Sequence, residues 1–170
     1  GSSIRQEHVA RDFAEHFPTL SRRLQTAETE REFAELYIEL TDWHVRLEYS
    51  NEEGLLDTVQ SLLVDLRKDF GSWIKSEYPK WMQGARKGRP SLSVDLVGKY
   101  LAPILGKSSV MFVLLDCLRM DQWKVIAPLL VPYFEIQESY HYSILPTATP
   151  YCRNAIFSGL FPDQLFESYG

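Results

Sequence analysis

The chain has 170 residues, of which 45% are hydrophobic and 24% are charged, and this composition is typical of a soluble globular protein with a sizeable core. A formal net charge of -5 argues against a general nucleic-acid coat, and the longest apolar runs are too short to cross a bilayer, so we expect no membrane partner. With only two cysteines, Cys117 and Cys152, the chain has no disulfide framework, and a reducing, cytoplasmic location is the default expectation.

Apolar side chains recur at helical spacing from Ile4 to about Leu101, and this pattern predicts a series of amphipathic helices. The first predicted helix contains Pro18, which should kink or interrupt it, and the third should weaken near Pro79. The apolar face of the second predicted helix consists of Phe33, Leu36, Tyr37, Leu40, Trp43 and Leu47. Three such helices with short links between them predict an antiparallel three-helix bundle over residues 1–90.

Two capping boxes mark the expected starts of the second and third helices. Thr29 and Glu32 have the spacing at which an N-cap hydroxyl and a carboxylate three residues later exchange hydrogen bonds with the backbone. Ser50 and Glu53 repeat this spacing, so the third helix is predicted to open at Ser50.

A linker is predicted at residues 84–91, because glycine, proline and serine are concentrated there. The same stretch contains the dense basic cluster of the chain, residues 86–90. A solvated linker is the plainer interpretation of that cluster, and contact with an anionic ligand or partner is the alternative. Beyond the linker, a further helix is expected from about Ser93 to Leu101, and Pro103 should end it.

From Ser109 the pattern changes to strand, helix, strand, helix, which predicts the start of an α/β domain over residues 91–170. The apolar run from Val110 to Leu115 stops at Asp116, so it predicts a buried parallel strand that places a carboxylate at its C-terminal edge. The other expected elements are a helix at residues 121–130, an extended aromatic segment at 133–144 and a helix at 149–158 that ends at Gly159. Two strands do not make a stable sheet, so the predicted fold class is mainly α, with the antiparallel bundle followed by the truncated start of an α/β domain.

Asp116 and Thr149 are the candidate chemical groups, because ligands of open α/β sheets bind where strand ends meet helix starts. An acid at the end of the first strand is a candidate metal ligand, and a hydroxyl at the start of the last helix is a candidate nucleophile. Asp116 alone could instead cap a strand-to-helix turn. Thr149 followed by Pro150 is also an ordinary N-cap and first-turn pair, and that interpretation is compatible with a nucleophile.

Residues 110–121 and 146–154 resemble the alkaline phosphatase superfamily and, within it, the PglZ domain. In that superfamily a first strand ends in a metal-binding aspartate, which Asp116 matches, and an arginine and a second acid often follow in phosphodiesterase members. A nucleophilic serine or threonine comes later at a helix start, which Thr149 matches. A helical bundle ahead of the PglZ segment looks like the output region of PorX-type response regulators, which are two-component signalling proteins associated with type IX secretion.

The resemblance implies that Asp116 and Thr149 bind zinc, with two zinc ions in the intact parent protein, and that Thr149 is the catalytic nucleophile. It implies a phosphodiesterase that acts on oligonucleotides, including cyclic ones, and regulates type IX secretion. Arg153 and Asn154 are further candidates for substrate contacts. For partners, the resemblance implies a homodimer in the parent protein and a sigma factor or another transcription partner.

Other polar groups of these two segments have simpler expected roles. The backbone N–H groups of Tyr151 and Cys152, at a helix start, could donate to a phosphate oxygen. Cys117 and Cys152 are interpreted as small buried residues, because two ligands are too few for a zinc site. Arg119 and Asp121 are interpreted as a structural ion pair, with a phosphate contact from Arg119 as the alternative.

The sequence departs from the superfamily in its metal ligands. The two-metal site needs further aspartates and histidines after the nucleophile, and zinc sites need three or four protein ligands. All histidines precede Thr149, namely His8, His16, His44 and His141. The acids after Thr149 are Asp163 and Glu167. We therefore expect this chain to be a fragment that lacks the C-terminal catalytic half, that does not bind zinc fully and that is inactive alone. PorX-type regulators also have an N-terminal receiver domain, so the resemblance implies that the fragment lacks this domain as well.

Two alternatives to a catalytic role remain open from the sequence. In the first, the chain is a non-catalytic signalling module whose helical bundle mediates dimerisation or docks a transcription partner. In the second, an unrelated all-helical domain only imitates the motif, and a structure without a strand at residues 110–115 would favour it.

Overall fold

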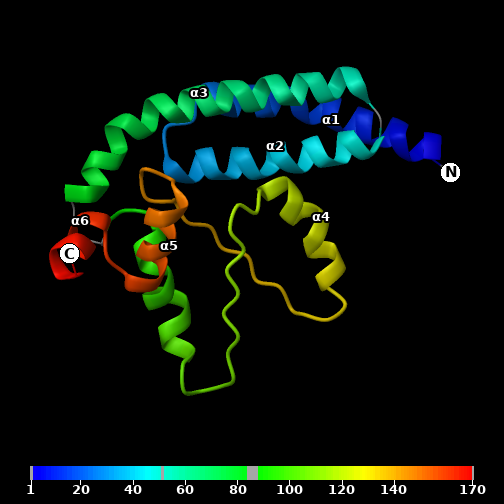
Figure 1. Cartoon of the computed structure of the whole chain (residues 1–170). Coiled ribbons are helices and arrows are strands. Elements are labelled where there is room, and N and C mark those ends of the chain that lie inside the picture. The colour runs from blue at the N-terminus through cyan, green and yellow to red at the C-terminus, as the bar shows by residue number, and fades with distance from the viewer. Residues whose placement is uncertain (1, 51, 84–87, 170) are drawn as a thin grey trace. The chain divides into compact units, whose positions relative to one another are not determined.

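The computed structural model describes residues 2–50, 52–83 and 88–169. These residues are mainly helical and fall into two compact units (Figure 1). The bundle unit comprises Gly1–Ala85 and Leu118–Ile136, and the site unit comprises Arg86–Cys117 and Gln137–Gly170. Within the described ranges, no helix combines the length and the apolarity that a membrane crossing requires.

Three long helices build the bundle unit: α1 (Ser2–Gln25), α2 (Glu30–Ser50) and α3 (Glu53–Gln83). They run alternately in opposite directions (Figure 1), so the predicted antiparallel arrangement is present. Their apolar faces meet in a core that includes Phe13, Leu20, Phe33, Leu36, Leu40, Leu47, Val59 and Leu66. Both α1 and α3 continue through their prolines, Pro18 and Pro79. A proline removes only one N–H donor, and packing of the apolar face supplies most of a helix's stability.

The predicted capping box at the start of α2 is confirmed, and the one at α3 is wrong. The Glu32 N–H donates to Thr29 Oγ1 at 3.3 Å, and the Thr29 N–H donates to Glu32 Oε2 at 3.0 Å. Ser50 is the last residue of α2, and its hydroxyl donates to the Leu47 carbonyl at 2.9 Å. Because that side chain bonds back into α2, it does not cap α3, which begins at Glu53.

A fourth helix, α4 (Met120–Leu130), packs against α2 within the bundle unit. Its start is held by a hydrogen bond from the Arg119 N–H to Gln122 Oε1 at 3.0 Å. The Arg119 guanidinium pairs with Asp121 through Nε–Oδ1 and Nη2–Oδ2 contacts of 3.0 and 2.7 Å, so the predicted ion pair is confirmed. Hydrogen bonding from Arg119 lowers the pKa of the Asp121 carboxyl, since it favours the charged form.

The site unit is built from short helices, which are η1 (Ser93–Asp95), η2 (Val97–Leu101), η3 (Ala102–Ile104), α5 (Thr149–Ser158) and α6 (Pro162–Tyr169). The single helix predicted from Ser93 to Leu101 is therefore an irregular succession of 3₁₀ and π turns. The predicted end of α5 is confirmed, because Gly159 caps it with φ of 68°, a left-handed conformation that glycine adopts without a Cβ clash. The packing of α5 against η1 gives this unit a core that includes Leu92, Val94, Ile144 and Ala155.

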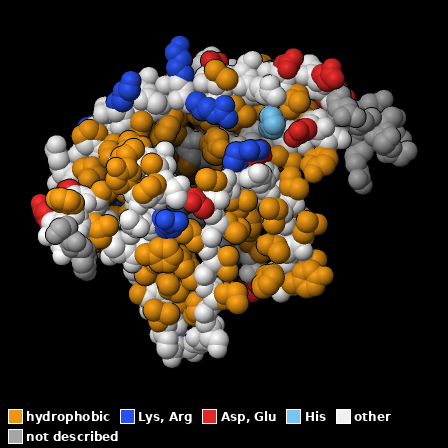
Figure 2. Space-filling model, in the orientation of Figure 1, with side chains coloured by type: hydrophobic (Ala, Val, Ile, Leu, Met, Phe, Trp, Pro, Cys, Tyr) orange, Lys and Arg blue, Asp and Glu red, His pale blue; other side chains and the backbone are white. Residues whose placement is uncertain are grey.

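The strand predicted at residues 110–115 is wrong. Among the described residues no strand is formed, and the sheet-like pairing is limited to one isolated parallel bridge between Leu92 and Tyr142. A strand exists only when a neighbour pairs with its backbone, and no described segment pairs with this one. All six side chains of the run are exposed, from 37% for Val110 to 87% for Met111. Figure 2 shows that many hydrophobic side chains lie on the face of the molecule that it draws. The predicted α/β architecture is therefore not seen in the described residues.

Candidate functional site

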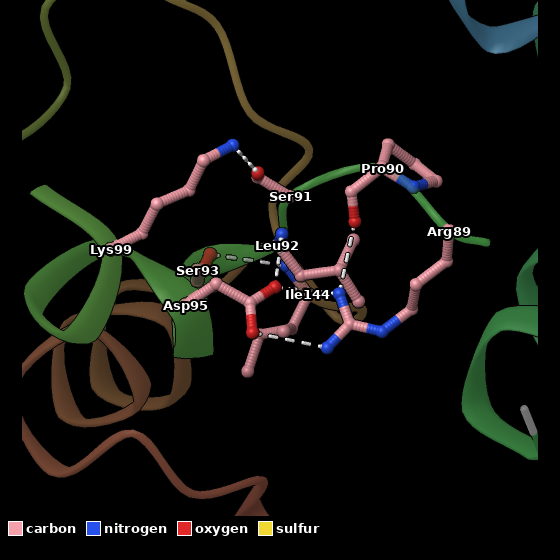
Figure 3. Close-up of polar contacts among 8 residues, drawn as sticks. All are labelled: Arg89, Pro90, Ser91, Leu92, Ser93, Asp95, Lys99 and Ile144. Carbon is pink, nitrogen blue, oxygen red and sulfur yellow. Dashed lines mark hydrogen bonds and ion pairs between the residues drawn. The ribbon is translucent and has the colours of Figure 1, made fainter. Parts of the chain in front are cut away.

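The chain segment that leads to α5 is anchored by the turn at residues 89–95 (Figure 3). The Tyr142 N–H donates to the Ser91 carbonyl at 2.9 Å, and the Ser93 N–H donates back to the Tyr142 carbonyl at 3.2 Å. The Ile144 N–H donates to Ser93 Oγ at 3.3 Å, and both of these residues are fully buried. The backbone five residues before Thr149 is thus fixed to the core of the site unit.

A buried ion pair holds that turn in place. Arg89 Nη1 and Nη2 contact the Asp95 carboxylate at 2.6 and 3.2 Å, and the two side chains are only 5% and 14% exposed. The same carboxylate accepts the Leu92 N–H at 2.9 Å (Figure 3). Arg89 is therefore not the solvated linker side chain that the sequence predicted for the basic cluster. Residues 84–87, which carry the rest of the predicted linker and cluster, lie outside the described residues.

Thr149 is the first residue of α5, and Ala148 occupies the N-cap position with φ of -80° and ψ of 140°. The expectation that Thr149 itself is the N-cap is wrong by one residue. The N–H groups of Tyr151 and Cys152 both donate to the Ala148 carbonyl at 3.0 Å. Since these donors are already used inside the first turn, the idea that they bind a phosphate oxygen is also wrong.

Asp116 follows a segment that contacts α5, although no strand carries it there. The Phe112 and Phe157 rings meet edge to face with centroids 5.7 Å apart, which ties Phe112 to the C-terminal part of α5. Burial raises the pKa of the Cys152 thiol, and the negative charge of Asp116 raises it further. Asp116 and the whole of α5 belong to the site unit. Asp116 and Thr149 therefore lie in the same compact unit, and Thr149 begins the helix against which Phe112 packs.

The turn directly after Asp116 is unusual. Cys117 has φ of 59°, a left-handed conformation that is uncommon for a residue with a side chain. Its Sγ lies 3.7 Å from Asp116 Oδ1. Cys117 is exposed and Cys152 is half-buried, so the expectation that both are buried is wrong for Cys117. No lysine or arginine among the described residues pairs with Asp116, which leaves its exposed carboxylate open to a cation.

The donor atoms of this site fit part of a metal centre. A carboxylate and a threonine oxygen are hard donors, and zinc accepts carboxylate oxygen alongside histidine and cysteine. A zinc site needs at least three protein ligands, however. In the part of the chain that the structure describes, no group of three or more His, Cys, Asp and Glu residues could hold a metal ion. Asp116 and Thr149 can therefore contribute to a zinc site but do not complete one.

Sequence reasoning missed a cavity of about 330 Å³ between α5 and α6. Its wall includes Asn154, a predicted substrate contact, together with Tyr151 and Phe166. Arg153, the other predicted contact, lies exposed on α5 and does not line the cavity. The helix α6, which forms one side of the cavity, was not predicted. Its first residue is Pro162, and a proline in the first turn is a sequence signal for a helix start.

Two family models match successive parts of the chain. Residues 3–82 match the PorX response regulator linker domain, and residues 96–168 match the BREX system PglZ alkaline phosphatase-like domain. The chain is thus similar to a PorX linker domain followed by a PglZ domain. This confirms the resemblance drawn from the sequence. A comparison with curated proteins gave no match.

The PglZ match contains Asp116, Thr149, Arg153 and Asn154. This match argues against the alternative that an unrelated helical domain only imitates the motif, even though residues 110–115 do not form a strand. The match also contains α4, which packs against α2 in the PorX linker domain. The two family regions are therefore in contact through this helix, inside the bundle unit.

Proposed function

We propose that the chain is part of a PorX-type response regulator whose intact form is a zinc-dependent phosphodiesterase. Its substrates are oligonucleotides, including cyclic ones, and its activity regulates type IX secretion. The observation that supports the proposal is that Asp116 and Thr149, the first residue of α5, lie in the same compact unit and within the PglZ match. In this proposal Asp116 is a zinc ligand, and Thr149 Oγ1 is the nucleophile and a second ligand.

The chemistry of the two residues follows from their environment. A free threonine hydroxyl is a poor nucleophile at neutral pH, and zinc, when bound, favours the deprotonated alcohol. Thr149 Oγ1 gives up its proton and forms a bond to phosphorus, while the bond to the leaving oxygen breaks and that oxygen takes up a proton. A water molecule later cleaves the bond between Thr149 Oγ1 and phosphorus and releases the nucleotide. Asp116 provides a carboxylate that is exposed and can reach a cation.

A complete zinc centre needs ligands beyond the two in the described residues. We therefore propose that the isolated chain is inactive and that the intact parent protein, which contains this chain, supplies the others.

The metal role of Asp116 is tested by zinc content. In the intact parent protein we expect Asp116→Asn to lower the bound zinc from two ions to one or fewer, because an amide oxygen carries no charge to offset a divalent cation. Inductively coupled plasma mass spectrometry after dialysis measures the ratio of zinc to protein. Asp163→Asn, an exposed acid on α6, is the matched control and should keep both ions. Unchanged zinc content and affinity in Asp116→Asn would exclude Asp116 as a ligand.

A second candidate function is a signalling module in which the bundle dimerises or docks a transcription partner such as a sigma factor. The match of residues 3–82 to a response regulator linker and the contact between α2 and α4 favour it. Through that contact, a change in the linker domain can reach the PglZ region. Both functions can coexist in the parent protein, with the bundle regulating the enzyme.

This module predicts that the chain self-associates through the bundle without help from metal. We expect sedimentation velocity of residues 1–170 to show a dimer at tens of micromolar, with the same dissociation constant in EDTA and in zinc buffer. A monomer at all concentrations tested would rule out dimerisation by this region.

A further inference from the structure

The cavity between α5 and α6 has the size and lining of a small-molecule subsite. Its volume of about 330 Å³ lies at the lower end of ligand pockets, which usually span about 300–1,000 Å³. The lining residues include Pro150, Tyr151, Asn154, Leu160, Leu165 and Phe166. None of the lining residues carries a charge. A charged group such as a phosphate would find no counter-ion there, so the natural occupant is neutral.

The walls of the cavity are held by hydrogen bonds in the turn between the two helices. The Leu160 N–H donates to Ser158 Oγ at 3.1 Å, and the left-handed Gly159 reverses the chain. The Phe161 N–H donates to Gln164 Oε1 at 3.1 Å, which caps the start of α6. Because these bonds fix α6 against α5, the cavity exists before a ligand arrives, and binding need not order the turn.

Two aromatic rings in the wall are free to stack on a flat ligand. Tyr151 is 46% exposed and Phe166 is 76% exposed. An aromatic side chain left open in a cavity wall is a stacking surface for a nucleic-acid base, since every base has a π-face. Asn154 adds an exposed amide, which both donates and accepts hydrogen bonds and can pair with the polar edge of a base.

We propose that this cavity binds one nucleobase of the oligonucleotide substrate. A nucleobase is flat and can stack on the aromatic rings, and its polar edge can form hydrogen bonds with the Asn154 amide. It is also neutral, as the uncharged lining requires. The inference rests on the proposed function, because it assigns a subsite of the same site. Pro150 lines the cavity and directly follows Thr149, so the proposed base subsite adjoins the turn that carries the proposed nucleophile.

The proposal is tested by comparing two labelled probes that carry the same phosphates. One is a single-stranded triadenylate, and the other is its abasic counterpart; fluorescence anisotropy with the 170-residue chain measures both affinities. We expect the triadenylate to bind at least tenfold more tightly. Phe166→Ala should weaken triadenylate binding about five- to a hundredfold, the range for losing one base-aromatic stack, and leave the abasic probe unchanged.

Two further variants keep the test decisive. Phe134→Ala removes an aromatic ring that is 64% exposed but does not line the cavity, so it should change neither affinity. Asn154→Leu keeps a side chain of similar size and should reduce the preference for triadenylate over the abasic probe. This variant tests the cavity even if Phe166→Ala unfolds α6. Equal affinity of the chain for both probes, or equal losses in the Phe134 and Phe166 variants, would overturn the proposal.

The outcome for the cavity is separate from the outcome for catalysis. A base-dependent affinity that Phe166→Ala removes supports the cavity even if the intact parent protein hydrolyses no phosphodiester. Conversely, hydrolysis that depends on Thr149 together with equal binding of the two probes would refute the base subsite and leave the proposed function standing.

Discussion

Replacing Thr149 with alanine is expected to lower phosphodiesterase turnover in the intact parent protein by about a thousandfold or more. The substitution removes the oxygen that forms the bond to phosphorus, and loss of a nucleophile leaves only the rate enhancement from binding and electrostatics. Stability should not fall, because Thr149 is only half-buried and alanine is a better helix former at the start of α5. The measurement is kcat on a short oligonucleotide at saturating substrate, with circular dichroism to verify the fold.

The chain offers a matched control for this variant two residues earlier. Thr147 is exposed, has the same side chain and precedes the helix, so Thr147→Ala should retain turnover within about twofold, as surface substitutions generally do. Thr149→Ser keeps a hydroxyl at the same position and should retain measurable activity. Turnover in Thr149→Ala above about a tenth of the parent value would show that another group attacks the phosphorus, since losing the attacking atom costs far more than tenfold.

The bundle was predictable from the sequence because helices depend on local contacts. A hydrogen bond from residue i to i−4 and an apolar face at i, i+3 and i+4 are both visible in a short window, so Leu36, Leu40 and Leu47 appear in the core as expected. Ser50 shows the limit of such patterns. Its spacing to Glu53 equals that of a true capping box, but its hydroxyl has a competing acceptor in α2, and spacing alone does not reveal that competitor.

The prediction of a strand at residues 110–115 is wrong because a strand depends on pairing partners elsewhere in the chain. An apolar run indicates that a segment is suited to burial. A strand also requires a neighbouring backbone that pairs with it, and no described segment pairs with residues 110–115. The meeting of Asp116 with Thr149 stays a prediction, although the packing of Phe112 on Phe157 places a residue shortly before Asp116 against α5. The cavity beside Tyr151 depends on the angle between α5 and α6, which is set by the turn at Gly159. The spacing of apolar residues along the sequence does not predict that angle.

The second large effect is expected at the buried pair of Arg89 and Asp95. Arg89→Met keeps a long apolar stem but removes the guanidinium that neutralises a carboxylate only 14% exposed. Breaking one side of such a pair costs about 3 kcal/mol, because the remaining charge stays in a poorly solvated place. That carboxylate also accepts a hydrogen bond from the Leu92 N–H. The substitution should therefore destabilise the turn that anchors Tyr142 and the segment leading to α5.

Hydrogen exchange resolved by residue measures this effect in the site unit alone. We expect protection of the Ser93 and Tyr142 amides to fall about a hundredfold, since 1.4 kcal/mol corresponds to a factor of ten. All four tryptophans lie in the bundle unit, so the unfolding transition seen by tryptophan fluorescence should not move. Combining Arg89→Met with Asp95→Asn removes both charges, keeps an oxygen acceptor for the Leu92 N–H and should restore most of the protection. Unchanged exchange in Arg89→Met would mean that the ion pair does not hold the turn, and the anchoring of α5 would then rest on the Ser93 contacts.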